Sequence, residues 1–570
     1  MQRLFALAGA GVLLAGLPAH GDPLGDPLPE SRRIDWAVAG VPGGIPHRST
    51  VCATFMPGAT AAEINAAITS CKDGVVALGE GTFSAVSLGG PIVLSASNVT
   101  LRGAGADKTI LTGGHIISLG RGGTIAVDTA ITGGGLKDSR DVTLASVAEL
   151  TVGTMIEIDR EDDASLVVNT GKQGGGTRNI TQLNAIAAIS GTKITLRNPL
   201  FHDFSQGEPR VKARFLSVRR SGVEDLKLDH AGFSGGYSFL VEYCDSCWVK
   251  GVESVNVQGY HFVLLGTLNV ELRDSFIHVG GGGPNNSGIN FYGNYQYGAN
   301  SSALIENTIF NRVFPAIELN GSSSGFTIAY NYSHGTPEQG GSGLVTWTFD
   351  DGHAPFNVRN LYEGNIAEMW GSDSYFGGSG YGVALRNHFT GFNPLHEVAS
   401  EAVWLGRLAY NYSLVGNVLG SPQQAATAYA GCGTPAIYRL GYPNLGNCSA
   451  SPWDGFAASG GYPDPKVAET LLRWGNYDHF NAAARFEAAE IPAGVPVPAD
   501  QALPASYRYA EKPAWWPADP PWPPIGPDVT GGDGDASGHV YKTPALRCWD
   551  KLDLKAGGAL SASRCYPPAG

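Results

Sequence analysis

Short runs in which apolar and polar residues alternate fill the central third of the chain, between Ser238 and Gly420. Alternation with a period of two is typical of β-strands that bury one face. The runs are "HFVLL", "GINFYG", "AIELNG", "VTWTFD", "SDSYFG" and "AVWLG". Steps of 28 residues from Phe262 fall in successive runs, at Asn290, Glu318, Thr346, Ser374 and Ala402. A repeat of this length predicts a parallel β-solenoid, in which each coil buries its apolar face by stacking on its neighbours.

A second column of strands follows the first, and each of its members carries Asp or Asn near its end. These residues are Asp274, Asn307, Asn331, Asn365, Asn387 and Asn411. Asn tolerates the left-handed backbone conformation, and its side chain can hydrogen-bond to a neighbouring coil. We therefore interpret this column as structural rather than catalytic.

The regions around the repeat differ in pattern. Residues 22–50 form an N-terminal extension, and residues 51–114 contain a helix at "TAAEINAAITSC", with a capping box from Thr60 to Glu63, followed by the first coils. Residues 115–213 are expected to form a β-rich insertion, and residues 214–420 the main coils. Residues 421–570, which include the Pro- and Trp-rich stretch 513–527, are expected to pack on the solenoid as a strap.

The first 21 residues have the charged start, short apolar run and small-residue end of a secretory signal peptide. Secretion implies an oxidising compartment, so the eight cysteines are expected to form four local disulfides: Cys52–Cys71, Cys244–Cys247, Cys432–Cys448 and Cys548–Cys565. Zinc at Cys244 and Cys247 is disfavoured because no second ligand pair lies nearby. No other segment is apolar enough to span a membrane. The net charge of −13, without a long basic run, argues against a nucleic-acid partner.

The stretches "ATAAEINAAITSCKDGVVALGEGTF" and "NVTLRGAGADKTIL" resemble the N-terminal coils of the pectate-lyase-like superfamily. The resemblance implies an all-β, right-handed parallel β-helix capped by the N-terminal helix. It implies little about activity, because the superfamily includes lyases, hydrolases, epimerases and phage tailspikes. The signature motifs of pectate lyases and polygalacturonases are not assembled here.

Alternation along the strands predicts which residues face outward. Ile289, Phe291, Ile317, Leu319, Val403 and Leu405 suit the interior, which leaves Asn290, Glu318 and Trp404 outside. Asp373 or Ser374 is outward in its own coil. If Glu318 and Asp373 lie two coils apart, their carboxyl groups are about 9.6 Å apart, near the upper limit for a water-containing pair in inverting glycoside hydrolysis. The alternative is an unrelated exposed pair.

The stretch "WTFDDGHAPF" is predicted to form a turn that borders a substrate groove on the outer face of the β-helix, because Asp350, Asp351, Gly352 and Pro355 are turn-forming residues. The candidate catalytic residues are Glu318, Asp350, Asp351, His353 and Asp373. The candidate substrate-binding residues are Trp370, Tyr375, Arg386, His388 and Trp404, since aromatic rings pack on sugars and Arg or His can hold a carboxylate.

These features predict a secreted, extracellular or periplasmic enzyme that degrades a polysaccharide, as a lyase acting on a uronic acid polymer or as a glycoside hydrolase. The lyase alternative needs Arg386 or a bound Ca2+ to neutralise the substrate carboxylate, and no other cofactor is expected. The second hypothesis is a non-catalytic carbohydrate-binding or adhesive β-helix. We expect a monomer.

Overall fold

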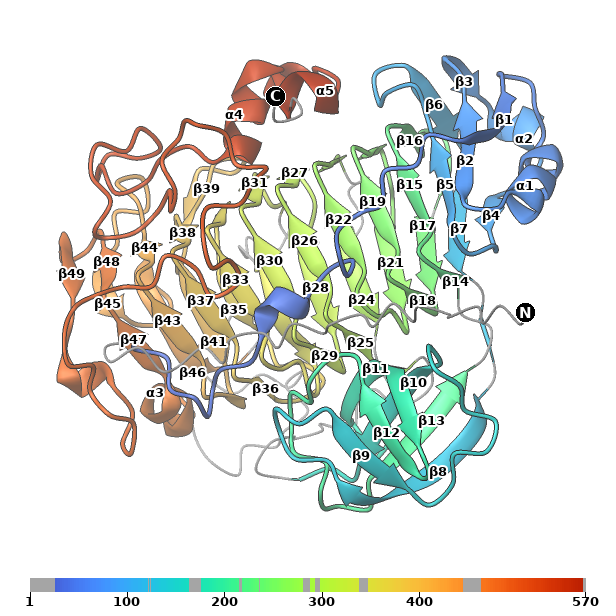
Figure 1. Ribbon diagram of the computed structural model, residues 1–570. Helices are drawn as coiled ribbons and strands as arrows, with labels where there is room; N and C mark the ends of the chain where they lie inside the picture. The colour runs from blue at the N-terminus through green and yellow to red at the C-terminus, as the bar shows by residue number, and fades with distance from the viewer. Residues whose placement is uncertain are drawn as a thin grey trace, which may run out of the picture.

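The computed structural model describes residues 26–120, 122–123, 125–163, 176–214, 218–234, 236–279, 288–292, 298–337, 347–443, 448 and 463–566. The predicted signal peptide and Thr346 of the predicted repeat lie outside these ranges. The described residues form a right-handed parallel β-helix, as predicted from the sequence, built from three long sheets of 12, 12 and 11 strands (Figure 1). Each coil of the chain passes through sheet 1, sheet 2 and sheet 3 in turn.

Sheet 1 includes the first and last coils of the solenoid. Its strands, in spatial order, are β1 (Val51–Phe55), β2 (Gly74–Leu78), β5 (Val99–Arg102), β15 (Gly222–Glu224), β19 (Trp248–Lys250), β22 (Glu271–Arg273), β26 (Leu304–Glu306), β30 (Thr327–Ala329), β33 (Leu361–Glu363), β37 (Val383–Leu385), β43 (Ser413–Val415) and β47 (Leu472–Trp474).

Sheet 2 follows sheet 1 after a tight bend. Its strands are β3 (Gly81–Phe83), β6 (Thr109–Thr112), β16 (Lys227–Asp229), β20 (Glu253–Val255), β23 (Phe276–His278), β27 (Ile309–Asn311), β31 (Tyr332–His334), β34 (Ile366–Ala367), β38 (His388–Phe389), β44 (Val418–Leu419), β48 (Asn476–Asp478) and β49 (Ala483–Arg485).

Sheet 3 carries the outward column predicted from the sequence. Its strands are β4 (Ile92–Leu94), β7 (Ile117–Gly120), β17 (Tyr237–Glu242), β21 (Tyr260–Leu265), β24 (Ile289–Tyr292), β28 (Ile317–Asn320), β32 (Phe349–Ala354), β35 (Trp370–Ser372), β41 (Val403–Gly406), β46 (Ala436–Tyr442) and β45 (Ala428–Ala430). The three sheets thus include strands well past Gly420.

Among the described residues, four short strand pairs lie at the corners of the coils. They are β14 (Val218–Arg219) with β18 (Cys244–Asp245), β25 (Asn300–Ser301) with β29 (Ser323–Ser324), β36 (Ser379–Gly380) with β42 (Ala409–Tyr410), and β39 (Phe392–Asn393) with β40 (Val398–Ala399).

The interval of 28 residues is not constant along the solenoid. Ile289 pairs with Ile317 at that interval, but Ile317 pairs with Phe349, and Trp370 pairs with Val403. The corners between the sheets differ in length from coil to coil, and only the strand register is kept. Ser374 accordingly lies after β35 with φ 54°, outside any strand.

A column of buried asparagines connects the later coils at the bend between sheets 1 and 2. Asn331 Nδ2 donates to Asn365 Oδ1 at 3.0 Å, Asn365 to Asn387 at 2.8 Å, and Asn387 to Asn417 at 3.0 Å. Asn417 donates to Asn476 at 2.8 Å. The left-handed residue lies one position earlier in each coil, as at Asp274, Asn307 and Arg386. The left-handed backbone and the hydrogen bonds to neighbouring coils, both predicted for one column, therefore belong to two adjacent positions, and Asn411 of that predicted column lies instead at the corner before β43.

The segment between β7 and β14 forms a closed six-stranded barrel beside the solenoid (Figure 1). Its strands are antiparallel: β8 (Ile125–Gly134), β9 (Asp141–Leu144), β10 (Met155–Arg160), β11 (Ile180–Ser190), β12 (Lys193–Leu196) and β13 (Arg210–Arg214). Phe356 and Val358 of the solenoid pack into the apolar core of the barrel, which fixes the barrel against the corner that follows β32.

Helices are few and lie outside the stack of coils. They are α1 (Ala61–Ser70), α2 (Ala85–Leu88), α3 (Pro465–Thr470), α4 (Pro544–Lys551), α5 (Ala562–Cys565) and the 3-10 turns η1 (Trp36–Val38), η2 (Ala488–Glu490) and η3 (Leu554–Ala556). The predicted capping box of α1 is present, with Thr60 and Glu63 bonded in both directions. No helix in the described ranges is long and apolar enough to cross a membrane.

All four predicted disulfides are present, at Cys52–Cys71, Cys244–Cys247, Cys432–Cys448 and Cys548–Cys565. The N-terminal segment before β1 and the C-terminal segment after β49 both run along the solenoid (Figure 1). Arg32 bonds to the carbonyl of Tyr412, whereas Asn269 donates to the carbonyl of Val38, so the N-terminal segment crosses many coils.

We expect Asn387→Ala to lower the free energy of unfolding by about 3 kcal/mol, because it leaves several buried polar groups of adjacent coils without partners. The backbone N–H and the side chain of Asn365 both donate to Asn387 Oδ1. The change is measured by urea unfolding followed by circular dichroism. The control is Asn481→Ala, which alters an exposed amide and should change the value by less than about 1 kcal/mol. Equal effects of the two substitutions would contradict a structural role for the column.

Candidate functional site

Three polar side chains are stacked on the outer face of sheet 3. Asn290 of β24 pairs in register with Glu318 of β28, which pairs with Asp350 of β32. The residues predicted to point inward, among them Ile317 and Leu319, lie in the main apolar core. In the two coils before Asn290, the same column contains Val263 and Leu240, so the run of three polar residues begins at Asn290.

Strand β32 is irregular where it carries the candidate residues. Glu318 pairs with Asp350, but Asn320 pairs with Ala354, so β32 contains extra residues opposite β28. The prediction of a turn at "DDGHA" is therefore wrong, because these residues continue the sheet through a bulge. Gly352 lies in this bulge, where a Cβ atom would be 2.0 Å from Ser372 Oγ and 2.3 Å from Ser379 Oγ. Only glycine fits this position without displacing its neighbours.

The imidazole of His353 is the centre of the cluster. Its Nδ1 lies 2.6 Å from Asp373 Oδ2 and 3.9 Å from Asp350 Oδ2, and its Nε2 lies 3.6 Å from Glu318 Oε1. Asn290 Nδ2 donates to the other oxygen of Glu318. The ring therefore occupies the space between Glu318 and Asp373 in which the sequence spacing predicted room for a water.

The three carboxyl groups change the protonation of His353. Burial alone would lower the pKa of His353, but the charges of Asp373, Glu318 and Asp350 outweigh burial and raise this pKa to about 10. The ring is thus an imidazolium at neutral pH. It stays accessible, since 22% of its side chain is exposed against 12% for Glu318.

Asp350 is harder to ionise than an ordinary carboxyl group. Burial, followed by the charge of Asp373, raises the pKa of Asp350 well above its usual range, although His353 opposes the shift. Its Oδ1 accepts hydrogen bonds from the backbone N–H groups of Gly352 at 3.0 Å and Asp373 at 3.2 Å. Only 5% of its side chain is exposed. Burial and the charge of Asp373 favour a carboxylic acid at this position, against the opposing effects of the N–H groups and His353.

Aromatic rings border the cluster on two sides. The ring of Tyr375 is nearly parallel to that of His353, with centroids 5.7 Å apart, and Phe376 meets His353 edge-on at 4.9 Å. On the Glu318 side, the hydroxyl groups of Tyr260 and Tyr292 lie 3.0 Å apart. Burial, assisted by the charge of Glu318, raises the pKa of both phenols. Sequence reasoning missed Tyr260 and Tyr292; their signal is position, since they lie in the strands that precede Glu318 in the same sheet.

Asp351 is separated from the other candidate catalytic residues. The bulge directs it into the solenoid, where Asn360 Nδ2 and the hydroxyl of Tyr362 donate to its Oδ1 at 3.0 and 3.2 Å. Burial raises its pKa to about 8 despite these hydrogen bonds. It has no surface exposure, so it has no direct access to a substrate.

Four of the five candidate substrate-binding residues lie away from the cluster. Trp370 is in the core, stacked on Phe389, and Arg386 forms a two-pronged ion pair with Asp528. Trp404 shares the outward column but is covered by other side chains, with its ring 4.2 Å from that of Trp347 and 3.6 Å from the guanidinium of Arg439. His388 lies on sheet 2. Only Tyr375 contacts the cluster.

The donor atoms of Glu318, Asp350 and His353 lie within 4.8 Å of one another, close enough to surround a cation. The set does not suit the calcium ion considered from the sequence, because calcium takes six to eight oxygen ligands and one of these three donors is a nitrogen. The protonated ring of His353 also supplies positive charge between the carboxyl groups already. We therefore assign no step to calcium.

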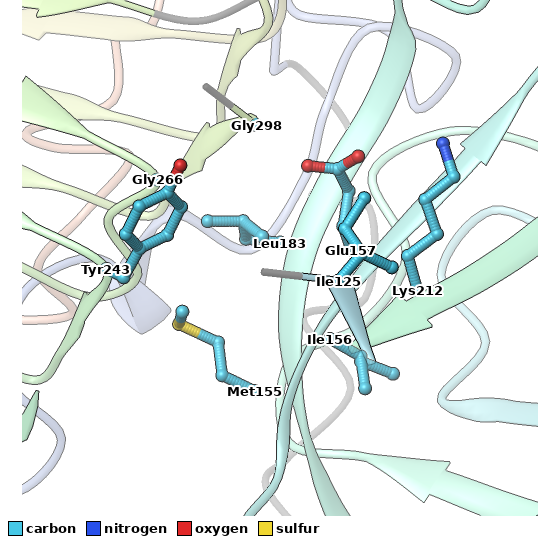
Figure 2. A pocket seen from close by; sticks show the side chains of 9 residues that line it. All are labelled: Ile125, Met155, Ile156, Glu157, Leu183, Lys212, Tyr243, Gly266 and Gly298. Atoms are coloured by element: carbon cyan, nitrogen blue, oxygen red, sulfur yellow. The ribbon is translucent and has the colours of Figure 1, made fainter. Parts of the chain in front are cut away.

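A small cavity lies where the barrel meets the solenoid, near the corners that follow β21 and β24. Figure 2 shows Tyr243 and Leu183 across it from Glu157 and Lys212. Its volume of about 20 Å3 is enough for a water molecule but not for a sugar ring. The barrel is therefore joined closely to the solenoid here, and the cavity is not a substrate site.

No protein-family model and no curated protein sequence matches the chain. Several solved structures have a similar fold. An alginate lyase from Paenibacillus sp. str. FPU-7 is 13% identical, with a TM-score of 0.40 over 68% of this chain and 98% of that one. The tailspike gp61 of Pseudomonas phage phi297 is 14% identical, with a TM-score of 0.38 over 67% and 71% of the two chains. The A-module of the Azotobacter vinelandii mannuronan C-5 epimerase AlgE4 is 14% identical, with a TM-score of 0.34 over 66% and 92%. These similarities concern the fold alone.

We expect His353 to stabilise the fold most at acidic pH. Its pKa is about 10 in the folded protein and about 6.5 when unfolded, so its stabilisation is complete below about pH 6.5 and is lost as the pH rises toward 10. The free energy of unfolding should therefore fall more steeply between pH 6.5 and 10 in the wild type than in His353→Gln. Urea unfolding at a series of pH values measures both slopes. The control is His396→Gln, at an exposed site, which should keep the wild-type slope. Parallel curves for the wild type and His353→Gln would contradict the assignment.

Proposed function

We propose that the protein is a secreted glycoside hydrolase that cleaves a polysaccharide on the outer face of sheet 3. The observation that carries the proposal is the pair Glu318 and Asp350, which are neighbours in register and differ in environment. Asp350 is buried with a raised pKa, whereas Glu318 receives an N–H from Asn290 and faces the imidazolium of His353. Carboxyl groups with environments that favour opposite protonation states are what glycoside hydrolysis requires.

Each residue of the cluster has a role in this proposal. Asp350 is the general acid that protonates the leaving oxygen of the glycosidic bond, and Glu318 is the ionised carboxylate that attacks or stabilises the anomeric carbon. The Nε2–H of protonated His353 faces Glu318 and holds it in place, and Asp373 fixes the ring through Nδ1. Tyr375 extends the site with a ring against which a sugar can pack.

The separation of the two carboxyl groups favours retention of configuration at the anomeric carbon. Glu318 and Asp350 are register neighbours on adjacent strands, which lie about 4.8 Å apart, closer to the roughly 5 Å between the carboxyl groups of retaining enzymes than to the 6.5 Å or more of inverting ones. In this arrangement Glu318 is the nucleophile, and Asp350 later acts as the base that activates water.

The setting of the cluster suits an extended polymer. It lies in the middle of a long sheet, with coils before and after it on the same face, whereas a small metabolite is usually held in an enclosed pocket. The four disulfides agree with folding in an oxidising compartment.

The lyase alternative is less well supported by the geometry. β-Elimination on a uronic acid needs a positive group free to neutralise the substrate carboxylate. Arg386, considered for this role, is paired with Asp528, and the imidazolium of His353 already faces three carboxyl groups. Non-catalytic binding is the other alternative, in which the aromatic side chains hold sugar without cleavage.

We expect the purified protein to release reducing ends from at least one polysaccharide in a panel of neutral and uronic acid polymers. Glu318→Gln and Asp350→Asn should each lower kcat by at least about a hundredfold, because each removes a group that acts directly in the reaction. The matched control is Glu242→Gln, a glutamate of β17 in the same sheet, which should change kcat less than about twofold. Circular dichroism of each variant checks that the fold is kept.

The products distinguish the alternatives. Proton NMR of the first products should show retention of the anomeric configuration. Ultraviolet absorbance from unsaturated products would identify a lyase and reject the hydrolase proposal. Binding to a polymer without reducing ends or unsaturation would favour the non-catalytic alternative, and normal rates in both active-site variants would place the site elsewhere.

A further inference from the structure

A second cluster of metal-binding side chains lies on the outer face of sheet 2, near the C-terminal end of the solenoid. It contains His388 of β38, His479 directly after β48, and Asp535 of the C-terminal segment. His479 Nε2 lies 3.1 Å from Asp535 Oδ2, and His388 Nε2 lies 3.9 Å from the same oxygen. None of the three takes part in the contacts described for Glu318, Asp350 and His353, so this is a separate site.

The spacing of the three side chains matches a coordination shell. The donor atoms all lie within 4.8 Å of one another. Ligands at about 2.0–2.1 Å from a tetrahedral zinc ion are themselves about 3.3 Å apart. The observed 3.1 and 3.9 Å lie on either side of that value, so small side-chain rotations bring the donors to one ion.

The neighbours of the three ligands are arranged as supports for a metal site. Ser537 Oγ lies 2.7 and 2.9 Å from the two carboxylate oxygens of Asp535, and the backbone N–H of Ser537 donates to Oδ1 at 3.2 Å, which fixes the orientation of the carboxylate. His388 is buried, and its Nε2, which lies nearest Asp535, is also 3.2 Å from the carbonyl oxygen of Gly420; zinc at Nε2 would replace this hydrogen bond. The other nitrogen, Nδ1, has no hydrogen-bond partner among the described residues, so the contacts of this ring are made through Nε2.

An open space adjoins the cluster and provides a way in for the ion. A cavity of about 250 Å3 is lined by His388 and Asp535, together with Glu368 and Thr390 of the solenoid and Gly534 of the C-terminal segment. It is large enough for water to occupy a coordination position that the protein does not fill.

We propose that His388, His479 and Asp535 bind one zinc ion, which fastens the C-terminal segment to the last coils of the solenoid. Two imidazoles and one carboxylate are a donor set that zinc binds well and that calcium and magnesium do not favour. The ion joins two coils to a loop that is also held where Ile525 pairs with Val540 and where Asp528 pairs with Arg386. This role is independent of polysaccharide cleavage on sheet 3.

The direct test is isothermal titration of the chelator-treated, dialysed full chain with ZnCl2. We expect one tight site per chain in the wild type. Asp535→Ala and His479→Ala should each weaken zinc binding at least a hundredfold, whereas His353→Gln, which alters the cluster on sheet 3, should keep the wild-type affinity. Addition of zinc to the wild type should raise the melting temperature by several degrees and slow proteolysis within residues 526–541. Neither change should occur in Asp535→Ala.

A substitution that keeps a zinc donor separates metal binding from a plain ion pair. Asp535→His should retain zinc binding, although it would destroy an ion pair with His479. Cobalt in place of zinc should give visible absorbance in the wild type that Asp535→Ala lacks. Absence of zinc binding in the wild type, or equal binding in the wild type and Asp535→Ala, would overturn the proposal. Zinc binding that is lost only in His353→Gln would assign the ion to the cluster on sheet 3 and would also overturn it.

Discussion

The stacking register of the coils is the constraint on which the rest of the structure depends. A strand displaced by one residue would exchange its inner and outer faces, so that Glu318 would enter the core and Ile317 would leave it. The bend between sheets 1 and 2 opposes this displacement, because in the later coils a left-handed residue is followed by a buried asparagine that bonds to the neighbouring coils. This column of buried asparagines runs from Asn331 to Asn476, and each member bonds to the coils beside it. The alignment of Asn290, Glu318 and Asp350 on sheet 3 therefore depends on this bend.

The site arises where the regular pattern is broken. Strand β32 contains extra residues opposite β28, and this bulge directs Asp351 inward while Asp350 and His353 remain on the outer face. Gly352 permits the bulge because Ser372 and Ser379 leave no room for a side chain. Irregularities of this kind re-aim side chains next to functional sites, and here the barrel is packed on the corner that follows. The asparagine column holds the coils in a fixed register, and the bulge in β32 brings the ionisable groups around His353 together.

Much of the fold, and about half of the site, could be predicted from the sequence. The alternation around Glu318 correctly placed it outside, and the spacing of the cysteines correctly paired all eight. The contacts of Arg386 and Trp404 could not be predicted, because their partners Asp528 and Arg439 come from segments without a repeat. The sequence predicts a turn where β32 has a bulge, because Asp, Gly and Pro are common in turns and in bulges alike. The meeting of His353 with Asp373 depends on that bulge and on the length of the next corner, neither of which has a periodic signal.

The cluster on sheet 3 is difficult to explain by stability alone. Three carboxyl groups around one imidazole require burial of charge, and apolar side chains of similar volume usually stabilise a protein at least as well. The same column holds Val263 and Leu240 in earlier coils, so the sheet accepts apolar residues at this position. The groups also depend on one another: the imidazolium offsets the repulsion between the carboxyl groups, and those groups keep it protonated. A concentration of mutually shifted, partly accessible ionisable groups in a few coils of an otherwise ordinary face is the pattern expected of a site maintained for chemistry.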